Sequence, residues 1–405
     1  MTQERTHCRI CDGQLETVLD MGTIYQSNFL TDASKAILAP LNLARCVKCN
    51  LVQLKHDGNL DSMYRQYWYK SSLNQSMVEA LRSVVDGING RVALEAGDVV
   101  VDIGCNDGTL LSMFPENVFK IGYDPSNNLA EEAQENCDFF INDYFPANYP
   151  VKAKAKVITS IAMFYDLPDP RAFIDKVRSI MRSDGIWVIQ FTDLLSMFQV
   201  NAFDNICHEH VEYYSLAVLK CLLEQHGFEV VDVLYNQVNG GSVRAYVGFN
   251  GVYAVTDAVS EMLKQEDLYM RSFDNPFAAF SDRVTQIKEQ CVEYIQHEHA
   301  AGKKIFITGA STKGNTLLQY FGLNKDIIPY AAEVNADKFG LRTVGTDIEI
   351  IPERQAIEMK PDMFLVLPWH FINGFLRSYH EYISGGGRLM VPMPRPIIYG
   401  PGVVE

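Results

Sequence analysis

Two pairs of closely spaced cysteines stand near the start of the chain, Cys8-x-x-Cys11 and Cys46-x-x-Cys49. Each two-residue spacer lets both sulfurs of a turn face one ion, so the four thiolates could hold a Zn²⁺ ion tetrahedrally. The 34 residues between the pairs exceed the common spacing of about 15–20, and the alternative is four unrelated thiols. Because four sulfur ligands would close the site to water, we expect a structural metal without catalysis.

A glycine turn follows an apolar run that ends near Asp102, and it contains Gly104, Asn106 and Gly108. Glycine lets the backbone approach a ligand, and the start of the following helix supplies free amide donors. Asp124, twenty residues beyond Gly104 at the end of the next expected strand, could accept hydrogen bonds from ribose hydroxyls. The spacing D-x-G-x-x-x-G lacks the dinucleotide fingerprint, and the alternative is a plain tight turn.

The same turn resembles motif I of S-adenosylmethionine-dependent methyltransferases. That resemblance implies that Asn142 and Asp143 lie where such enzymes contact adenine, and that Met163, after the expected fourth strand, lines the cofactor. The nucleoside would then be enclosed from several strand ends.

A third group is the segment His208-Glu209-His210. A histidine close to a carboxylate can act as a base near neutral pH, while the carboxylate sets its tautomer or charge. A metal site is less favoured because the spacing H-E-x-x-H is absent. The remaining alternative is a loop that takes no part in chemistry.

A second glycine turn begins at Gly309, after one expected strand and before a helix. It is not a Walker loop, but its free amides, hydroxyls and ammonium group could gather around a pyrophosphate. Glu333, twenty-four residues farther on, would suit a ribose or sugar hydroxyl. The alternative is a duplicated fold that keeps the turn without a ligand. The other residues expected to contact substrate here are Ser311, Thr312, Lys313, Gly314 and Asn315.

Buried strands must alternate with helices to place these turns, and the sequence supports such an α/β arrangement. A helical connector is expected over 256–302. Strands 229–235 and 243–249 are expected to form an antiparallel hairpin. The other strands of the first series are expected at 99–103, 119–124, 156–161 and 186–191, and a second series is expected to start near Lys304, Ile327, Met363 and Arg388.

The composition narrows the class of protein. A chain of 405 residues with 47% hydrophobic and 21% charged residues predicts two to three globular domains at ~150 residues each. The net charge, 35 − 50 = −15, disfavours nucleic-acid and anionic membrane partners. With no run of ~18 apolar residues and no signal-peptide core, we expect a cytoplasmic protein whose nine cysteines are thiols or metal ligands.

Over essentially its whole length, the chain resembles the sugar C-methyltransferase family, which acts on nucleotide-linked 4-keto deoxysugars. The resemblance implies S-adenosylmethionine as methyl donor, a structural zinc, and a nucleotide-sugar held mainly by the C-terminal domain. The expected domains are a zinc-binding module (1–65), a class I methyltransferase Rossmann-like domain (66–255), and a helical connector with a second Rossmann-like domain (256–405).

The resemblance also implies catalytic residues. The family pattern Tyr-His-Glu-His is matched by Glu209 and His210, but Cys207 stands in place of the tyrosine. A further family tyrosine lies in Tyr-x-Tyr-x-Ser-Ser, where either Tyr67 or Tyr69 could correspond.

We therefore predict methyl transfer to a carbon of a nucleotide-linked keto sugar through an enolate, with His210 as base, Glu209 as its partner, and His208 as a further candidate. Asp166 stands where some family members have a histidine, so the sugar, the methylated carbon and the oligomeric state stay open. The alternatives are O- or N-methylation of a sugar or small metabolite, a non-catalytic nucleotide-sugar-binding or scaffold protein, and an NAD-dependent zinc dehydrogenase.

Overall fold

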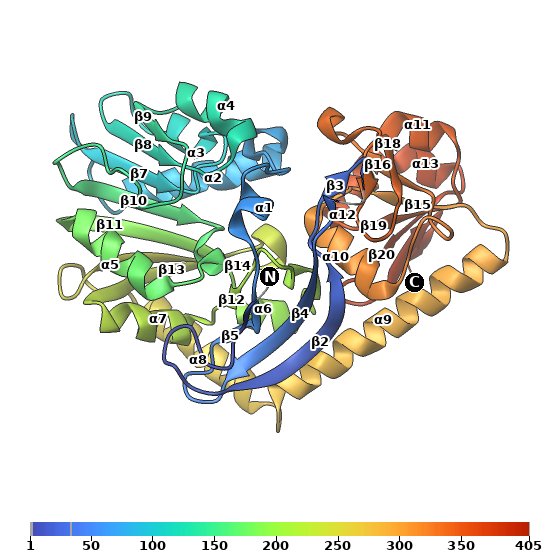
Figure 1. The fold of residues 1–405 in the computed structure, drawn as a ribbon, viewed down its shortest axis with the longest axis horizontal. Coiled ribbons are helices and arrows are strands. Elements are labelled where there is room, and N and C mark those ends of the chain that lie inside the picture. Colours follow the sequence, from blue (N-terminus) through green and yellow to red (C-terminus); the bar gives the residue numbers. More distant parts are fainter. Residues whose placement is uncertain (1–2, 33–34, 405) are drawn as a thin grey trace.

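The computed structural model describes residues 3–32 and 35–404. Two open α/β sheets stand side by side, with the N-terminal strands in front of them and the long helix α9 running beneath the second (Figure 1). The first sheet confirms the six predicted strands and their antiparallel hairpin, and it adds one edge strand. Its order is β13 (Phe228–Asn236), β14 (Ser242–Phe249), β11 (Met181–Thr192), β10 (Ala155–Ile161), β7 (Val99–Ile103), β8 (Phe119–Tyr123) and β9 (Phe139–Ile141).

The second sheet is also built around parallel strands, as the four apolar runs predict. Parallel strands carry their carboxyl ends on one edge, which is where ligands bind in open α/β sheets. Its order is β22 (Val403–Val404), β21 (Ile397–Gly400), β20 (Arg388–Val391), β19 (Met363–Val366), β15 (Ile305–Thr308), β16 (Tyr330–Glu333), β18 (Glu349–Pro352), β17 (Arg342–Thr343) and β3 (Phe29–Leu30).

Helices flank both sheets, and their ends follow local capping rules. The connector expected over 256–302 forms two helices rather than one. The second helix has its own start, because Pro276 is its first residue and Asn275 caps it by accepting the N–H groups of Phe277 and Ala278. The helices of the first part are α1 (Leu60–Tyr64), α2 (Gln75–Asn89), α3 (Thr109–Ser112), α4 (Ala130–Glu135), α5 (Pro170–Ile180), α6 (Leu194–Gln199) and α7 (Leu216–Gln225). Those that follow are α8 (Asp257–Arg271), α9 (Pro276–Ala300), α10 (Thr312–Phe321), α11 (Glu353–Glu358), α12 (Ile372–Ser378) and α13 (His380–Ser384).

The N-terminal segment forms a third, antiparallel sheet that sequence periodicity did not reveal. Its strands are ordered β12 (Glu212–Tyr213), β5 (Val52–Leu54), β4 (Leu38–Cys46) and β2 (Leu15–Tyr25), and a separate pair joins β1 (Gln3–Glu4) to β6 (His56–Asp57). Among the residues that the structure describes, no helix is long and apolar enough to pass through a membrane.

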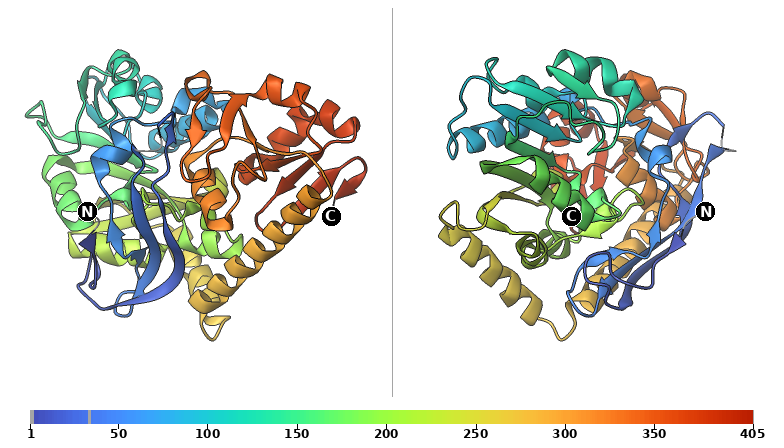
Figure 2. Two further views of the ribbon diagram at one scale, coloured as in Figure 1. Left: turned by 45° about the vertical axis from the view of Figure 1, so that its right-hand side comes forward. Right: turned by 60° about the vertical axis from the view of Figure 1, so that its left-hand side comes forward.

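The three sheets exchange strands, so they are not separate along the chain. Strand β3 from the N-terminal segment pairs with β17 at the edge of the second α/β sheet, and β12 from the first α/β part pairs with β5. The left view in Figure 2 shows the N-terminal strands between the other two parts, and the right view shows them along one side of the molecule. The domain boundaries at 65 and 255 therefore stay a prediction.

Candidate active site

Four cysteine sulfurs gather at one end of the N-terminal sheet. The Sγ atoms of Cys8, Cys11, Cys46 and Cys49 all lie within 4.8 Å of one another. Two sulfurs on a tetrahedral zinc, each about 2.3 Å from it, are ~3.8 Å apart, so the cluster fits the ion. A Cβ at Gly13 would lie 2.7 Å from Cys46 Sγ, so this turn has room only for glycine.

The first glycine turn joins β7 to α3 and leaves its backbone open to a ligand. Gly104 has a φ of 77°, and a Cβ there would lie 3.0 Å from Met163 Cγ. Asp124, just beyond β8, accepts the N–H of Asn106 on Oδ2 and the N–H of Ser126 on Oδ1, both at 2.8 Å. Because each carboxylate oxygen has a second lone pair, the fixed Asp124 can still accept from ribose hydroxyls.

Two residues of this motif act on the turn in different ways. Asp102 accepts a hydrogen bond from Thr159 Oγ1 at 2.6 Å, and burial raises the pKa of its carboxyl to about 7. Asp102 lines a large cavity that also contains the side chains described next. Gly108 instead packs against α4, where a Cβ on Gly108 would lie 2.6 Å from Asn136 Cβ. Gly108 therefore serves the close approach of two helices.

Of the two residues expected near adenine, only Asp143 lines the cavity. Asn142 Nδ2 donates to the carbonyl oxygens of Asp124 and Ser126, so this side chain supports the loop that carries Asp124. Asp143 lines the cavity and is paired with Arg65 at 3.0 Å.

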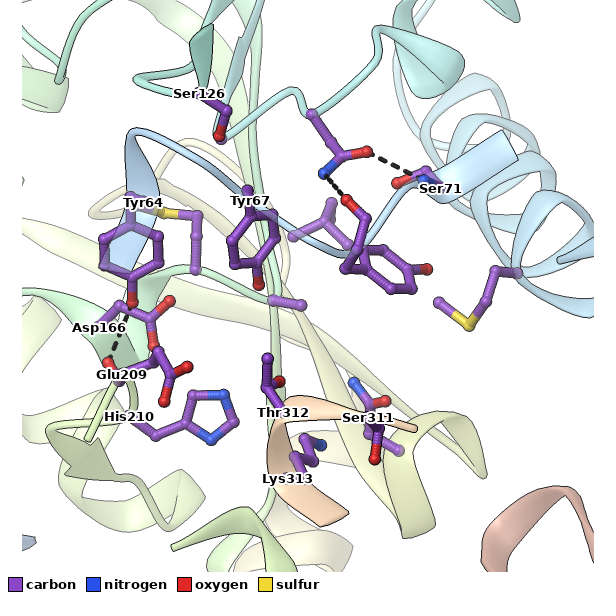
Figure 3. Close-up of a pocket in the computed structure, with 18 of the residues that line it drawn as sticks. Tyr64, Tyr67, Ser71, Ser126, Asp166, Glu209, His210, Ser311, Thr312 and Lys313 are labelled. Atoms are coloured by element: carbon purple, nitrogen blue, oxygen red, sulfur yellow. Dashed lines mark hydrogen bonds between the residues drawn. The ribbon is translucent and has the colours of Figure 1, made fainter. Parts of the chain in front are cut away.

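A cluster of titratable side chains lies deeper in the same cavity, where Tyr64, Tyr67, Asp166, Glu209 and His210 face one another (Figure 3). Tyr64 Oη donates to the carbonyl oxygen of Glu209 at 3.1 Å. Burial raises the pKa of both tyrosines well above the usual value, so both remain hydrogen-bond donors. Asp166 Oδ1 and Glu209 Oε2 are buried without a hydrogen-bond partner among the described residues, which leaves them available to a ligand.

The imidazole of His210 has a defined tautomer. Its Nδ1 donates to the carbonyl oxygen of Asn205 at 2.8 Å, and a carbonyl can only accept, so Nδ1 carries the hydrogen. The Tyr165 ring packs edge-on against it at 4.6 Å between centroids. Burial, with a smaller contribution from the Lys313 ammonium, lowers the pKa of His210 to about 3. His210 is therefore neutral near pH 7, with a free lone pair on Nε2.

Other predicted catalytic side chains lie at different places. His208 is only 4% exposed and its Nε2 contacts the Ala39 carbonyl at 3.3 Å, so it faces the N-terminal sheet and is not part of the cavity lining. Tyr69 lines the cavity near Ser71, but the residue is 43% exposed. Tyr64, by contrast, was not among the predicted residues, and its sole signal in the sequence is its position three residues before Tyr67.

The second glycine turn opens α10. Ser311 Oγ caps this helix by accepting the N–H of Gly314 at 3.0 Å. A Cβ at Gly314 would lie 2.6 Å from Leu367, and Asn315 is buried and donates to the Asn28 carbonyl at 3.3 Å. Gly314 and Asn315 are thus packing residues, while Ser311, Thr312 and Lys313 line the cavity.

Glu333, at the end of β16, is already held in place. Its Oε1 accepts the N–H groups of Val334 and Asn335 at 2.7 and 3.0 Å, and Oε2 accepts from Lys338 Nζ at 3.3 Å. Glu333 still lines the cavity, so it is a fixed acceptor at the mouth of the second turn.

A single cavity of about 1330 Å³ connects both glycine turns with the cluster around His210. A pocket for one small ligand measures about 300–1,000 Å³. This cavity therefore has room for two ligands, and residues from all three parts of the chain line it.

The first sheet and its glycine turn define a class I S-adenosylmethionine-dependent methyltransferase. Family models match three consecutive segments, described as a zinc binding domain (8–64), a methyltransferase domain (77–233) and a C-methyltransferase C-terminal domain (237–394). The chain belongs to the C-methyltransferase family. It is 30% identical over 405 residues to C-methyltransferase NovU of Streptomyces niveus, with 96% of each chain covered.

Among solved structures, two similar chains are other methyltransferases. Magnesium protoporphyrin IX methyltransferase (ChlM) from Synechocystis PCC 6803 is 16% identical, with a TM-score of 0.32 over 43% of this chain and 78% of its own. An S-adenosylmethionine-dependent methyltransferase from Clostridium acetobutylicum is 10% identical, with a TM-score of 0.35 over 44% and 94%.

Proposed function

We propose that this enzyme methylates a carbon of a nucleotide-linked keto-deoxysugar and that the reaction passes through an enolate. The observation that carries the proposal is the continuity of the cavity, which contains both glycine turns together with Glu209 and His210. A ligand with a nucleotide at one end and a sugar at the other would extend from the second turn to this cluster. The similarity to NovU, whose name describes a C-methyltransferase, supports transfer to carbon.

His210 is the proposed base. Its Nε2 lone pair is free because Nδ1 carries the proton, and a base beside the sugar ketone can remove a proton from the adjacent carbon. Tyr67 lies in the same pocket as Asp166 and Glu209 (Figure 3), and burial, with smaller contributions from these two residues, raises its pKa, so its hydroxyl keeps its proton and can donate to developing negative charge. This position, together with the greater exposure of Tyr69, favours Tyr67 as the family tyrosine.

Glu209 acts as the partner of the base in this proposal. Burial raises the pKa of its carboxyl, and its Oε2 has no partner among the described residues. A carboxylate in this position would compensate the charge of His210 once the imidazole has taken up a proton. S-adenosylmethionine, when bound at the first glycine turn, supplies the methyl group from its sulfonium.

The experiment is solvent exchange. The enzyme is incubated in D₂O with S-adenosylhomocysteine and a panel of UDP-, dTDP- and GDP-linked 4-keto-6-deoxyhexoses, and the sugars are analysed by mass spectrometry. We expect one deuterium to enter the carbon that S-adenosylmethionine later methylates. Methylation of an oxygen or nitrogen, without exchange at carbon, would contradict the enolate. Failure of every sugar nucleotide to react would contradict the substrate class.

A further inference from the structure

The side chain of Lys313, in the second α/β part, contacts a residue of the first α/β part. It lies in the first turn of α10, yet its Nζ donates to Asn205 Oδ1 at 2.6 Å. Asn205 ends the short 3-10 helix Phe203–Asn205, just before the segment with Glu209 and His210. The lysine that the sequence places at a pyrophosphate turn therefore projects toward the catalytic cluster (Figure 3).

Asn205 links this ammonium group to the proposed base. Its side-chain oxygen accepts from Lys313, and its carbonyl oxygen accepts from His210 Nδ1 at 2.8 Å. Tyr213 Oη donates to the same carbonyl at 3.2 Å, and Asn205 Nδ2 donates to the Ala202 carbonyl at 3.1 Å. Because Asn205 is almost fully buried and held from both sides, it fixes the lysine and the histidine relative to one another.

The charge of Lys313 acts on this cluster. It lowers the pKa values of Asp166 and Glu209, which opposes the larger effect of burial on these carboxyls. It also lowers the pKa of His210, which adds to the larger effect of burial there. Lys338, a buried lysine of the cavity wall, is instead bound to the Ala310 carbonyl and Glu333. Lys313 is thus the cation directed at the place where the proposed reaction generates negative charge.

This geometry also explains why a cation stands near a base. Before any enolate forms, the ammonium disfavours protonation of His210. Once an enolate forms between them, its negative charge compensates both cations. A fixed cation in a site shielded from water stabilises such a transition state far more than it stabilises the neutral ketone.

We infer that Lys313 is a catalytic residue that donates from its ammonium group to the ketone oxygen of the sugar and stabilises the enolate, and that it is not a pyrophosphate ligand. This assignment rests on the proposed function. In the step, His210 Nε2 takes the proton from the carbon beside the ketone, and the C–H electron pair becomes the new C=C bond. The carbonyl π electrons move to the oxygen, which Lys313 Nζ–H then binds.

Lys313→Met separates the two roles when exchange and nucleotide binding are measured side by side. We expect deuterium exchange at saturating sugar nucleotide to fall about 10²–10³-fold. The Kd values of UDP, dTDP and GDP alone, measured by calorimetry, should change by less than about twofold, because these probes carry the pyrophosphate but no ketone. The acidic limb of the exchange rate should also move to higher pH, because His210 loses a neighbouring cation. Lys264→Met, which removes an exposed lysine of α8 away from the cavity, is the matched control.

Several outcomes would overturn the assignment. Nucleoside diphosphate binding weakened tenfold or more, with unchanged exchange at saturation, would make Lys313 a pyrophosphate ligand. Unchanged binding and exchange would remove it from the site. If Lys313→Met does not fold, as judged by its zinc content and S-adenosylmethionine affinity, Lys313→Gln is compared in the same way. No exchange with the unaltered enzyme would instead reject the proposed function.

Discussion

The backbone N–H of Leu54 donates to the carbonyl oxygen of Val211 at 2.9 Å. This bond joins β5, in the sheet that carries the four cysteines, to the residue directly after His210. Gln53, the neighbour of Leu54, donates from Nε2 to Cys8 Sγ at 3.2 Å and is paired with Glu212 between β5 and β12. The metal module therefore supports the segment that carries the proposed base.

Loss of the cysteine cluster should therefore disturb more than the N-terminal sheet. We expect Cys8→Ser combined with Cys46→Ser to reduce zinc from one per chain to none, and to increase hydrogen exchange at Val211 and Glu212. Elemental analysis and hydrogen-exchange mass spectrometry measure these effects. Cys221→Ser, at an exposed cysteine outside the cluster, is the control. Unchanged zinc content in the double variant would contradict the assigned ligands.

Cofactor binding should depend on Asp124. A charged acceptor for ribose hydroxyls contributes about 1.5–3 kcal/mol, so Asp124→Ala should weaken S-adenosylmethionine binding by about ten- to a hundredfold. Gly104→Val should abolish binding, since a Cβ there would press on Met163, which lines the cavity, and valine is strained at this positive φ. Calorimetry measures both, with Asp267→Ala on α8 as control. An unchanged Kd in Asp124→Ala would exclude this residue from the site.

His210 should act as a base that stays neutral well below pH 6.5. Since its pKa is lowered to about 3 and the neutral imidazole is the active form, deuterium exchange should not decline between pH 7 and pH 5. A histidine with an ordinary pKa of about 6.5 would lose about 25-fold over this range. His210→Asn should reduce exchange by roughly 10²–10⁴. Undiminished exchange in this variant would place the base elsewhere.

Asp166 should act as a neutral acid. Burial raises the pKa of its carboxyl well above the usual value, which favours the protonated, neutral form. Asp166→Asn keeps the size, the absence of charge and an N–H donor, and we expect exchange within about threefold of the unaltered enzyme. Asp166→Ala should lose about tenfold, the effect of one hydrogen bond. Equal losses in the two variants would show that a charged carboxylate is needed.

The sequence predicted those features that depend on local pattern. Strands such as β7 and β8 are continuous apolar runs, and the turns that contain Gly104 and Gly309 follow directly from strand ends. The contact between Lys313 and Asn205 joins residues 108 positions apart. Likewise, the sheet that contains β12 joins segments distant along the chain. Such contacts depend on how the three parts of the chain pack against one another, which the hydrophobic periodicity of a single segment does not predict.

His208 should make stability depend on pH. Burial lowers its pKa to about 4, whereas the unfolded chain takes up this proton near 6.5. The contribution of neutral His208 to the free energy of unfolding is therefore fully present above pH 6.5. It declines by about 1.4 kcal/mol per pH unit as the pH falls from 6.5 toward 4. His208→Gln should flatten the dependence of the urea unfolding free energy on pH by one proton, and exposed His299→Gln should not. Equal slopes in both variants would contradict this effect.

The pairing of β3 with β17 has a consequence for synthesis in the cell. Strand β3 leaves the ribosome early, yet the edge it completes is made only after the whole methyltransferase part has been translated. Neighbouring contacts have the same long delay, since Tyr25 and Gln319 are bonded across 294 positions. During translation, β3 must therefore wait with unpaired backbone groups, whereas β2, β4 and β5 can already pair with one another. A fragment starting after the N-terminal segment would lack this strand and expose β17 as an open edge.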